Sequence, residues 1–123
     1  MIHKTIELTV VRHGETDWNK KHRIQGQIDT SLNNTGFAQA DAVAKSLKVK
    51  KFDAIVCSDL SRAKQTAEPL SANRPRIIYE PQLRERHLGI LQGLTAEEAA
   101  EQAPEDMRAF QNRSYAIPPS EAE

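Results

Sequence analysis

An arginine and a histidine stand at the end of an apolar run near the start of the chain. The run, Leu8–Val11, is rich in β-branched residues and leads directly into Arg12, His13 and Gly14. Because histidine has a pKa of about 6.5, much of its population is neutral at pH 7, and a ring nitrogen can then attack phosphorus. The planar guanidinium of Arg12 presents matched donors to phosphate oxygens. The pair indicates chemistry on an anion, whereas His13 taken alone is more often a hydrogen-bonded loop residue.

Two further charged residues could complete such a site. Arg62 falls in the first turn of a predicted helix, where free backbone amides and the helix dipole already favour an anion. Glu85 follows a predicted strand, and its carboxyl group could protonate a leaving alkoxide if burial or a bound phosphate raised its pKa. Each has an ordinary alternative, because either side chain could simply form a surface ion pair with a charged neighbour. His3 and His22 lie in polar surroundings and are weak candidates.

Three apolar runs predict the strands that would carry these residues. They span residues 5–12, 54–57 and 76–80, and we expect the first to be buried on both faces. Helices are predicted between them, so the order is strand, helix, strand, helix, strand. This alternation implies parallel strands joined by right-handed crossovers. Ligands bind at the carboxyl edge of such sheets, which favours a functional role for Arg62.

Apolar residues at helical spacing define the two connecting helices. Residues 33–35 offer caps for the first, which should close at the lysine-rich stretch 48–51. Residues 58–59 are predicted to cap the second, and Pro69 should end or kink it. The polar segment 13–33 is long for an unstructured connection, and loops of this length are usually functional or hold short turns.

The C-terminal third is more polar and less regular. A loop with two glycines is expected over residues 83–93. Thr95 and Glu98 then form a capping box for a short helix, and Pro104 can open another that continues through Phe110.

Length and composition limit the kinds of protein this can be. The chain has 123 residues, enough for one core, and we expect a single domain over residues 1–116 and a mobile tail over residues 117–123. Its 17 basic and 17 acidic residues balance, so no overall charge favours nucleic acid or an anionic membrane. No apolar stretch approaches the roughly 18 to 20 residues of a membrane span, and no secretory signal is evident. The single cysteine, Cys57, cannot form an internal disulfide, which fits a reducing compartment, and the default expectation is a cytoplasmic protein. Because Cys57 lies in an apolar run, we expect it in the core.

Several motifs occur along the chain in a fixed order. They are Val11–Asn19, Arg23–Asp29, Leu32–Gly36, Ser58–Ala67 and Leu83–Gly89. Together they resemble the histidine phosphatase superfamily, which includes cofactor-dependent phosphoglycerate mutases and many broad-specificity phosphatases. Several motifs in order are far more specific than the Arg-His-Gly triplet alone. The resemblance implies an α/β fold, namely a three-layer α/β/α arrangement with a mainly parallel sheet, similar to phosphoglycerate mutase.

The resemblance also implies a phosphohistidine mechanism with roles assigned by motif. His13 would be the nucleophile, while Arg12 and Arg62 would hold the transferred phosphoryl group. Glu85 would protonate the leaving group and later act as the base for water. Further contacts with phosphate or substrate would come from Asn19, Gln25 and Gly26. The resemblance implies no metal and, for a phosphatase, no cofactor; 2,3-bisphosphoglycerate would act as a primer only in a mutase.

The chain departs from the family pattern after Gly93. Family members carry a second catalytic histidine, before a glycine at the end of a later strand, whereas none of His3, His22 and His87 follows an apolar strand. A Pro-Gly-Gly-Glu-Ser stretch is also common in the family where residues 118–123 stand here. We therefore expect the amino-terminal part of a histidine phosphatase, apparently truncated, without the later strands and the second histidine.

The sequence favours a phosphatase over a mutase. Residues 25–27 resemble the phosphatase branch, and little sequence after Gly93 is left for the substrate-covering insertion of mutases. The expected partner is a small phosphorylated metabolite, with no nucleic acid and no membrane. The alternatives are phosphoglycerate mutase activity, or a catalytically impaired chain that only binds phosphate or self-associates as a homo-oligomer through an uncovered sheet edge.

Overall fold

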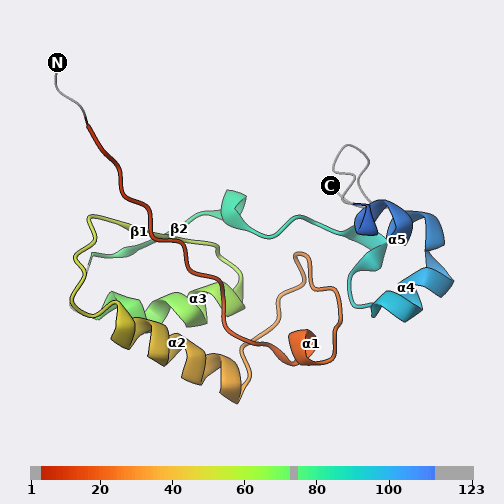
Figure 1. The fold of residues 1–123 in the computed structure, drawn as a ribbon, viewed down its shortest axis with the longest axis horizontal. Helices are drawn as coiled ribbons and strands as arrows, with labels where there is room; N and C mark the ends of the chain where they lie inside the picture. The colour runs from red at the N-terminus through yellow and green to blue at the C-terminus, as the bar shows by residue number, and fades with distance from the viewer. Residues whose placement is uncertain (1–3, 73–74, 113–123) are drawn as a thin grey trace.

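The computed structural model of the chain describes residues 4–72 and 75–112, which form short strands, helices and turns of 3-10 helix labelled η (Figure 1). In chain order the elements are α1 (Asp17–Lys20), α2 (Asn34–Ser46), β1 (Ile55–Cys57), α3 (Ser61–Ala67), η1 (Glu68–Ser71), β2 (Ile77–Tyr79), η2 (Pro81–Leu83), η3 (Gly89–Leu91), α4 (Ala96–Gln102) and α5 (Pro104–Gln111). The predicted tail, residues 117–123, lies outside the described residues.

β1 and β2 form a two-stranded parallel sheet, and α3 and η1 lie between them in the chain. Val56 lies opposite Ile78 at the centre of the register. The predictions of strands at 54–57 and 76–80 and of their parallel pairing are confirmed. Both strands are short because only three residue pairs make the ladder.

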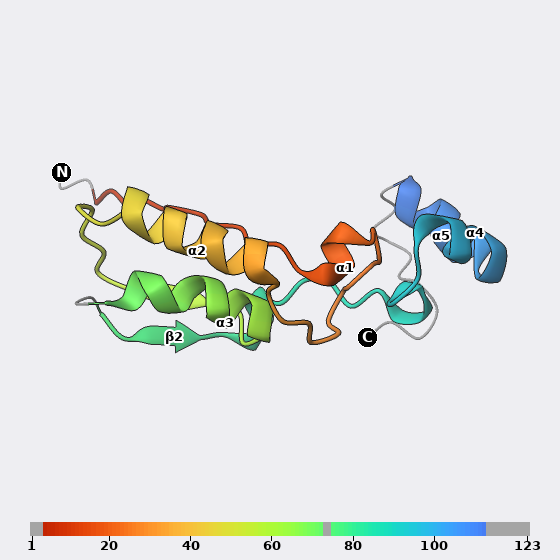
Figure 2. The same ribbon diagram turned by 90° about the horizontal axis from the view of Figure 1, so that it is seen from below.

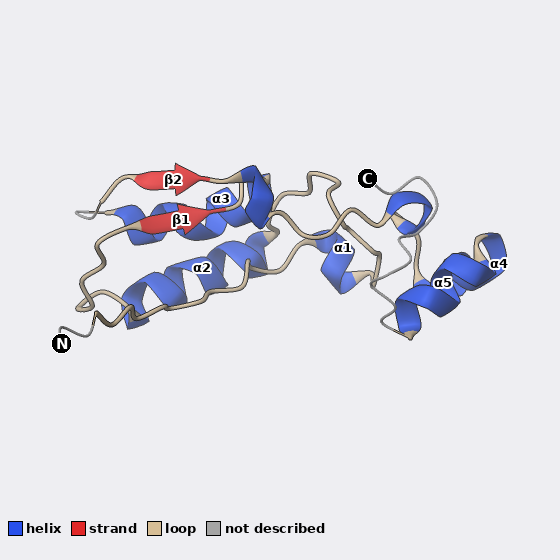
Figure 3. Ribbon diagram, turned by 90° about the horizontal axis from the view of Figure 1, so that it is seen from above, coloured by secondary structure: helices blue, strands red, loops and turns tan. Residues whose placement is uncertain are grey.

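The two longer helices of this half lie on the same side of the sheet. α2 packs on α3, and α3 packs on β1 (Figures 1 and 3). Cys57 and Ile77 face the helices and are buried against Ala67. The alternate residues Val56 and Ile78 face the other way and are 51% and 54% exposed. The α/β class is confirmed, and the described residues contain two of the three layers that we expected.

The predicted first strand does not form in this structure. Residues 5–12 follow an elongated path beside α2 (Figure 2) but have no strand partner among the described residues. A strand needs a neighbour for its backbone hydrogen bonds, and a cleft of about 750 Å³ lies between residues 8–13 and β1. The predicted burial on both faces is therefore wrong. Exposures of 83%, 82% and 90% are found for Ile6, Leu8 and Val10.

Side-chain caps decide where the helices begin. The side chain of Asn33 caps α2, as predicted, by accepting the backbone N–H three residues further on. The predicted cap of α3 at residues 58–59 is replaced by one from far along the chain: the carboxylate of Asp29 accepts both the backbone N–H and the hydroxyl of Ser61, 32 residues away. In the predicted cap, the hydroxyl oxygen of Ser58 accepts the backbone N–H of Leu60, the residue just before the helix. Pro69 ends α3 as predicted, and the chain continues as η1.

A second, separate core lies where α4, α5 and η3 meet, in the part of the fold that Figure 1 shows away from the sheet. The capping box of Thr95 and Glu98 opens α4, and Pro104 opens α5, as predicted. Arg23 links α4 to the polar segment 13–33, called the polar loop below, because its guanidinium donates to both carboxylate oxygens of Glu98. The buried residues of this core are Leu88, Leu91, Ala99, Ala103 and Met107.

Candidate active site

His13 is half-buried and its ring orientation is fixed. Its Nδ1 lies 2.6 Å from the carbonyl oxygen of Gly14. A carbonyl oxygen only accepts hydrogen bonds, so Nδ1 carries the proton and Nε2 of the neutral ring keeps its lone pair. Burial lowers the pKa of His13, the bond to Gly14 opposes this shift without reversing it, and nearby positive charges add to it. The neutral, nucleophilic form therefore dominates at pH 7.

Two glycines bring the first turn of α2 directly against the loop that carries His13. A Cβ atom at Gly14 would lie 2.5 Å from the carbonyl oxygen of Gly36, and one at Gly36 would lie 2.1 Å from that of Glu15. Both distances are far below van der Waals contact, so the two backbones can meet only without these side chains. The backbone N–H of Asn33 also donates to the backbone carbonyl oxygen of Glu15, at a distance of 3.0 Å.

Arg62 lies in the first turn of α3 and is only 2% exposed. Its Nη1 donates to the carbonyl oxygen of Ile28 at 2.7 Å, and its Nη2 to that of Gly26 at 2.6 Å. Burial lowers its pKa, but the ordinary pKa of arginine is so far above neutral that Arg62 stays charged at pH 7. Arg62 lines the same cleft as His13 and the exposed Arg12. The structure thus brings the three predicted phosphate-site residues together.

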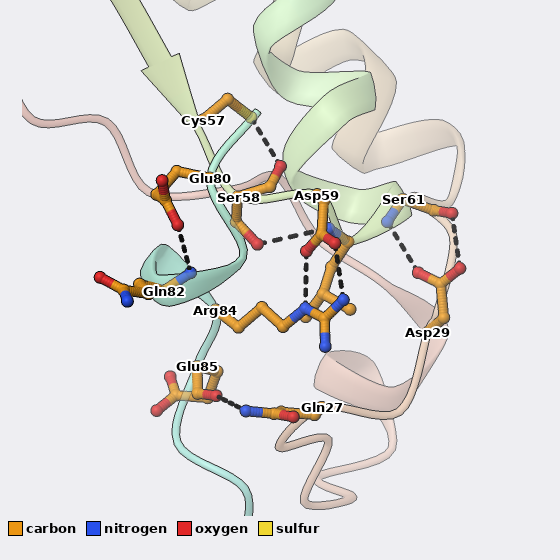
Figure 4. A network of polar contacts seen from close by, with 11 residues as sticks. Gln27, Asp29, Cys57, Ser58, Asp59, Ser61, Glu80, Gln82, Arg84 and Glu85 are labelled. Carbon is orange, nitrogen blue, oxygen red and sulfur yellow. Dashed lines mark hydrogen bonds and ion pairs between the residues drawn. The ribbon is translucent and has the colours of Figure 1, made fainter. Parts of the chain in front are cut away.

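Glu85 lines this cleft from the loop after η2, and its side chain is exposed. Its negative charge acts to raise the pKa of His13, against the larger effect of burial. Nε2 of Gln27 donates to the backbone carbonyl of Glu85 at 3.1 Å (Figure 4). The backbone N–H of the next residue donates to the carboxylate at 2.9 Å.

A charged pair that sequence reasoning missed holds the residue before Glu85. Nε and Nη2 of Arg84 each lie 2.6 Å from a carboxylate oxygen of Asp59, which makes the pair bidentate (Figure 4). The bond to Arg84 holds the pKa of Asp59 below its ordinary value. Arg84 also lines the cleft. Its place beside Glu85 in the same motif was the signal that could have pointed to it.

The three predicted substrate-contact residues do not line the cleft; they shape the polar loop beside it. The side-chain oxygen of Asn19 accepts the backbone N–H of Thr16 at 3.0 Å in the cap of α1. Gln25 is buried, and its side-chain oxygen accepts the hydroxyl of Thr16 at 2.6 Å. Gly26 has φ of +55°, which favours glycine, and offers its carbonyl to Arg62. All three therefore belong to the polar loop, and Gly26 is the one that contacts Arg62.

The architecture and the site define a class: an α/β protein with a histidine, two arginines and a glutamate around one cleft. The family model of the histidine phosphatase superfamily (branch 1) matches residues 8–123, and the chain belongs to this family.

Curated relatives and solved structures carry related names. The chain is 49% identical over 107 residues to a metal-independent phosphoserine phosphatase of Arabidopsis thaliana, which covers 85% of the chain and 45% of that protein. It is 45% identical to phosphoglycerate mutase-like protein 4 of the same plant, over 85% of the chain and 46% of that protein. A mycobacterial glucosyl-3-phosphoglycerate phosphatase, solved in complex with VO3, superposes with a TM-score of 0.73 at 41% identity, over 80% of this chain and 50% of that one. The chain thus spans about half the length of the relatives it matches.

Proposed function

We propose that the protein hydrolyses a phosphomonoester through a phosphohistidine formed on His13. The observation that carries the proposal is the hydrogen bond from Nδ1 to the carbonyl of Gly14, which leaves the lone pair of Nε2 available in the neutral ring. The fixed charge of Arg62 and the exposed guanidinium of Arg12 lie around the same cleft. Both would bind the transferred phosphoryl group and stabilise the charge on its equatorial oxygens.

The reaction takes two steps. Nε2 of His13 attacks phosphorus, the bond from phosphorus to the ester oxygen breaks, and the leaving alkoxide takes a proton from Glu85. Water then attacks the phosphohistidine, Glu85 accepts its proton, and the bond from phosphorus to Nε2 breaks to release inorganic phosphate. Because Glu85 is exposed, a bound phosphate beside it, and not burial, would have to favour its protonated form.

We propose a small phosphorylated metabolite as substrate, with phosphatase favoured over mutase activity. Support comes from the phosphatase names among the relatives, which include a phosphoserine phosphatase and a glucosyl-3-phosphoglycerate phosphatase. The name of the first relative also supports metal-independent chemistry. Similarity to a phosphoglycerate mutase-like protein keeps mutase activity as the alternative; such an enzyme would need priming by 2,3-bisphosphoglycerate, whereas the phosphatase needs no cofactor.

Incubation with p-nitrophenyl phosphate and detection of an acid-labile phosphoryl group by ³¹P NMR test this proposal. We expect phosphohistidine and turnover in the wild type, and neither in His13→Ala. Turnover that is unchanged in His13→Ala would contradict the phosphohistidine mechanism. Glu85→Gln provides a second arm with two substrates. It should slow the hydrolysis of an alkyl phosphate, whose alkoxide leaving group needs a proton, more than that of p-nitrophenyl phosphate, whose leaving group is acidic.

A second candidate function is a catalytically impaired chain that binds phosphate or self-associates. The observation that favours it is the exposure of apolar residues on the elongated N-terminal segment and on the open face of the sheet, such as Val10 and Val56. Activity that is absent while phosphate still perturbs the NMR signals of His13 would favour this candidate.

The proposal includes a location in the cytoplasm. In the part of the chain that the structure describes, no helix has the length and apolar character to cross a bilayer. The free thiol of Cys57, which is buried, supports a reducing compartment.

A further inference from the structure

We propose that Thr66 is a positioning residue for His13, assisted by Gln39, and that the two side chains together select the ring tautomer that leaves Nε2 free. The inference rests on the proposed function, because it concerns the same histidine. Neither side chain belongs to the set of residues that the sequence motifs assigned to the site. They come from two different helices, α3 and α2, and contact the two peptide units on either side of Gly14.

Thr66 holds the peptide unit before Gly14. Its Oγ1 accepts the backbone N–H of Gly14 at 2.9 Å, and its hydroxyl donates to the carbonyl oxygen of Arg62 at 2.7 Å. Thr66 is 5% exposed, and Gly14 is buried. A buried N–H without an acceptor is unfavourable, so this hydroxyl determines where Gly14 can lie. It also links the loop of His13 to the turn of α3 that carries Arg62.

Gln39 holds the peptide unit after Gly14. Its Oε1 accepts the backbone N–H of Glu15 at 2.8 Å. That N–H and the carbonyl of Gly14 belong to one planar trans peptide, so they point in opposite directions. Fixing the N–H toward α2 therefore fixes the carbonyl toward the other side, where it accepts Nδ1–H of His13.

The consequence concerns the chemistry of the histidine. In water, neutral imidazole side chains prefer the proton on Nε2, which would block the nucleophilic nitrogen. The carbonyl of Gly14 reverses this preference only if its peptide is held in place. Without Gln39, the peptide that carries this carbonyl can rotate; without Thr66, the N–H of Gly14 loses its acceptor, and Gly14 can shift together with its carbonyl. In either case the proton can return to Nε2 while the charged neighbours Arg12, Arg62 and Glu85 are unchanged.

The test is long-range ¹H–¹⁵N NMR of the full chain with ¹⁵N-labelled histidine, which distinguishes protonated from unprotonated ring nitrogens. The chain has four histidines, and the signals that disappear in His13→Gln identify the relevant ring. We expect Nδ1–H in the wild type, and a ratio of Nδ1–H to Nε2–H that falls roughly fivefold in Thr66→Val, which keeps the shape but removes the hydroxyl. Thr66→Ser should restore the wild-type ratio.

Thr35→Val on the exposed side of α2 is the matched control and should leave the ratio unchanged. A folded Thr66→Val protein with wild-type ring signals overturns the inference. If Thr66→Val does not fold, the variant Gln39→Leu decides, because Gln39 is exposed and its replacement should be tolerated. An unaltered ratio of Nδ1–H to Nε2–H in this variant overturns the inference too, and a lowered ratio supports it. Gln39→Glu, which keeps an acceptor, should behave as the wild type.

A kinetic arm separates this inference from the proposed function. If His13 is the nucleophile, Thr66→Val should lower kcat for p-nitrophenyl phosphate roughly 10- to 100-fold with little change in KM, because the attacking atom and not the binding site is disturbed. A wild type that forms no phosphohistidine defeats the proposed function, yet the NMR comparison still decides whether Thr66 sets the tautomer.

Discussion

The side chains around the cleft differ in whether they only line it or also hold the backbone beside it. His13 is oriented by one backbone carbonyl and lies beside positive charge. Arg62 is buried and donates to two backbone carbonyls, whereas Arg12 is exposed. The two arginines that the motifs treat as a matched pair therefore differ: Arg62 supports the loop as well as the site, and Arg12 lies exposed at the cleft.

A first prediction concerns the charge of His13. Its pKa in the folded chain lies below the ordinary value of 6.5, chiefly because of burial. The unfolded chain therefore binds the proton more tightly, so the stabilisation linked to His13 is complete above about pH 6.5 and is lost as the pH falls through the lowered pKa. NMR titration of the His13 ring should show a midpoint below 6.5. A midpoint at or above 6.5 would contradict the burial of the ring.

A second prediction compares the two arginines. Arg62→Gln should lower the free energy of unfolding by about 1–3 kcal/mol, because one buried and one partly buried carbonyl oxygen lose a charged donor. Arg12→Gln should change it by less than about 0.5 kcal/mol, as is usual for exposed positions. Urea unfolding followed by circular dichroism measures both, and both variants should lose phosphatase activity. Equal stability losses would show that Arg62 has no special structural role.

At the scale of elements, the polar loop organises the site by reaching across to α3. Asp29 caps this helix from the loop, and the carbonyls of Gly26 and Ile28 accept from Arg62 one residue further along α3. The loop and the helix therefore fix each other. Sequence patterns treat a helix cap as local, whereas here the cap is a tertiary contact that aligns Arg62 with the loop.

A third prediction follows for Asp29. Asp29→Ala should destabilise the chain by about 0.5–1 kcal/mol, at the low end for a helix cap because the carboxylate is exposed. Its bonds to Ser61 lower the pKa of Asp29 from the ordinary 3.8, so the difference from the wild type should be complete above that value and vanish as the pH falls through the lowered pKa. Asp41→Ala, on the exposed face of α2, is the control and should change the free energy of unfolding by less than about 0.5 kcal/mol.

At the scale of the whole molecule, the described residues leave a large apolar opening. The elongated N-terminal segment exposes Leu8 and Val10, the open face of the sheet exposes Val56 and Ile78, and the cleft lies between segment and sheet. Soluble monomers rarely leave such a surface uncovered. Backbone groups along an unpaired segment also favour pairing with another chain.

A fourth prediction is that the 123-residue chain self-associates. Size-exclusion chromatography at rising concentration should show an increasing apparent mass, and Val10→Lys should shift the protein toward the monomer. Val49→Lys is the matched control, because Val49 is equally exposed, at 92% against 90%, but lies in the turn region after α2. A wild-type chain that stays monomeric at every concentration would contradict the prediction.

The sequence by itself determined those features that depend on neighbours along the chain. The caps at Asn33 and Thr95, the stop at Pro69 and the apolar runs of β1 and β2 were all predicted, because caps, proline and periodicity act within a few residues. The motifs likewise predicted His13, Arg12, Arg62 and Glu85, which the structure places around one cleft.

Only the tertiary structure decided what depends on contacts distant in the chain. Residues 5–12 have the composition of a buried strand, but a strand exists only with a partner, and composition cannot supply one. Asp29 caps α3 from 32 residues away, and Thr66 holds Gly14 from 52 residues away. The sequence predicted His13 as the nucleophile, whereas the fold determined which of its two ring nitrogens carries the proton. The carbonyl of Gly14 accepts that proton, and contacts with α2 and α3 set its orientation.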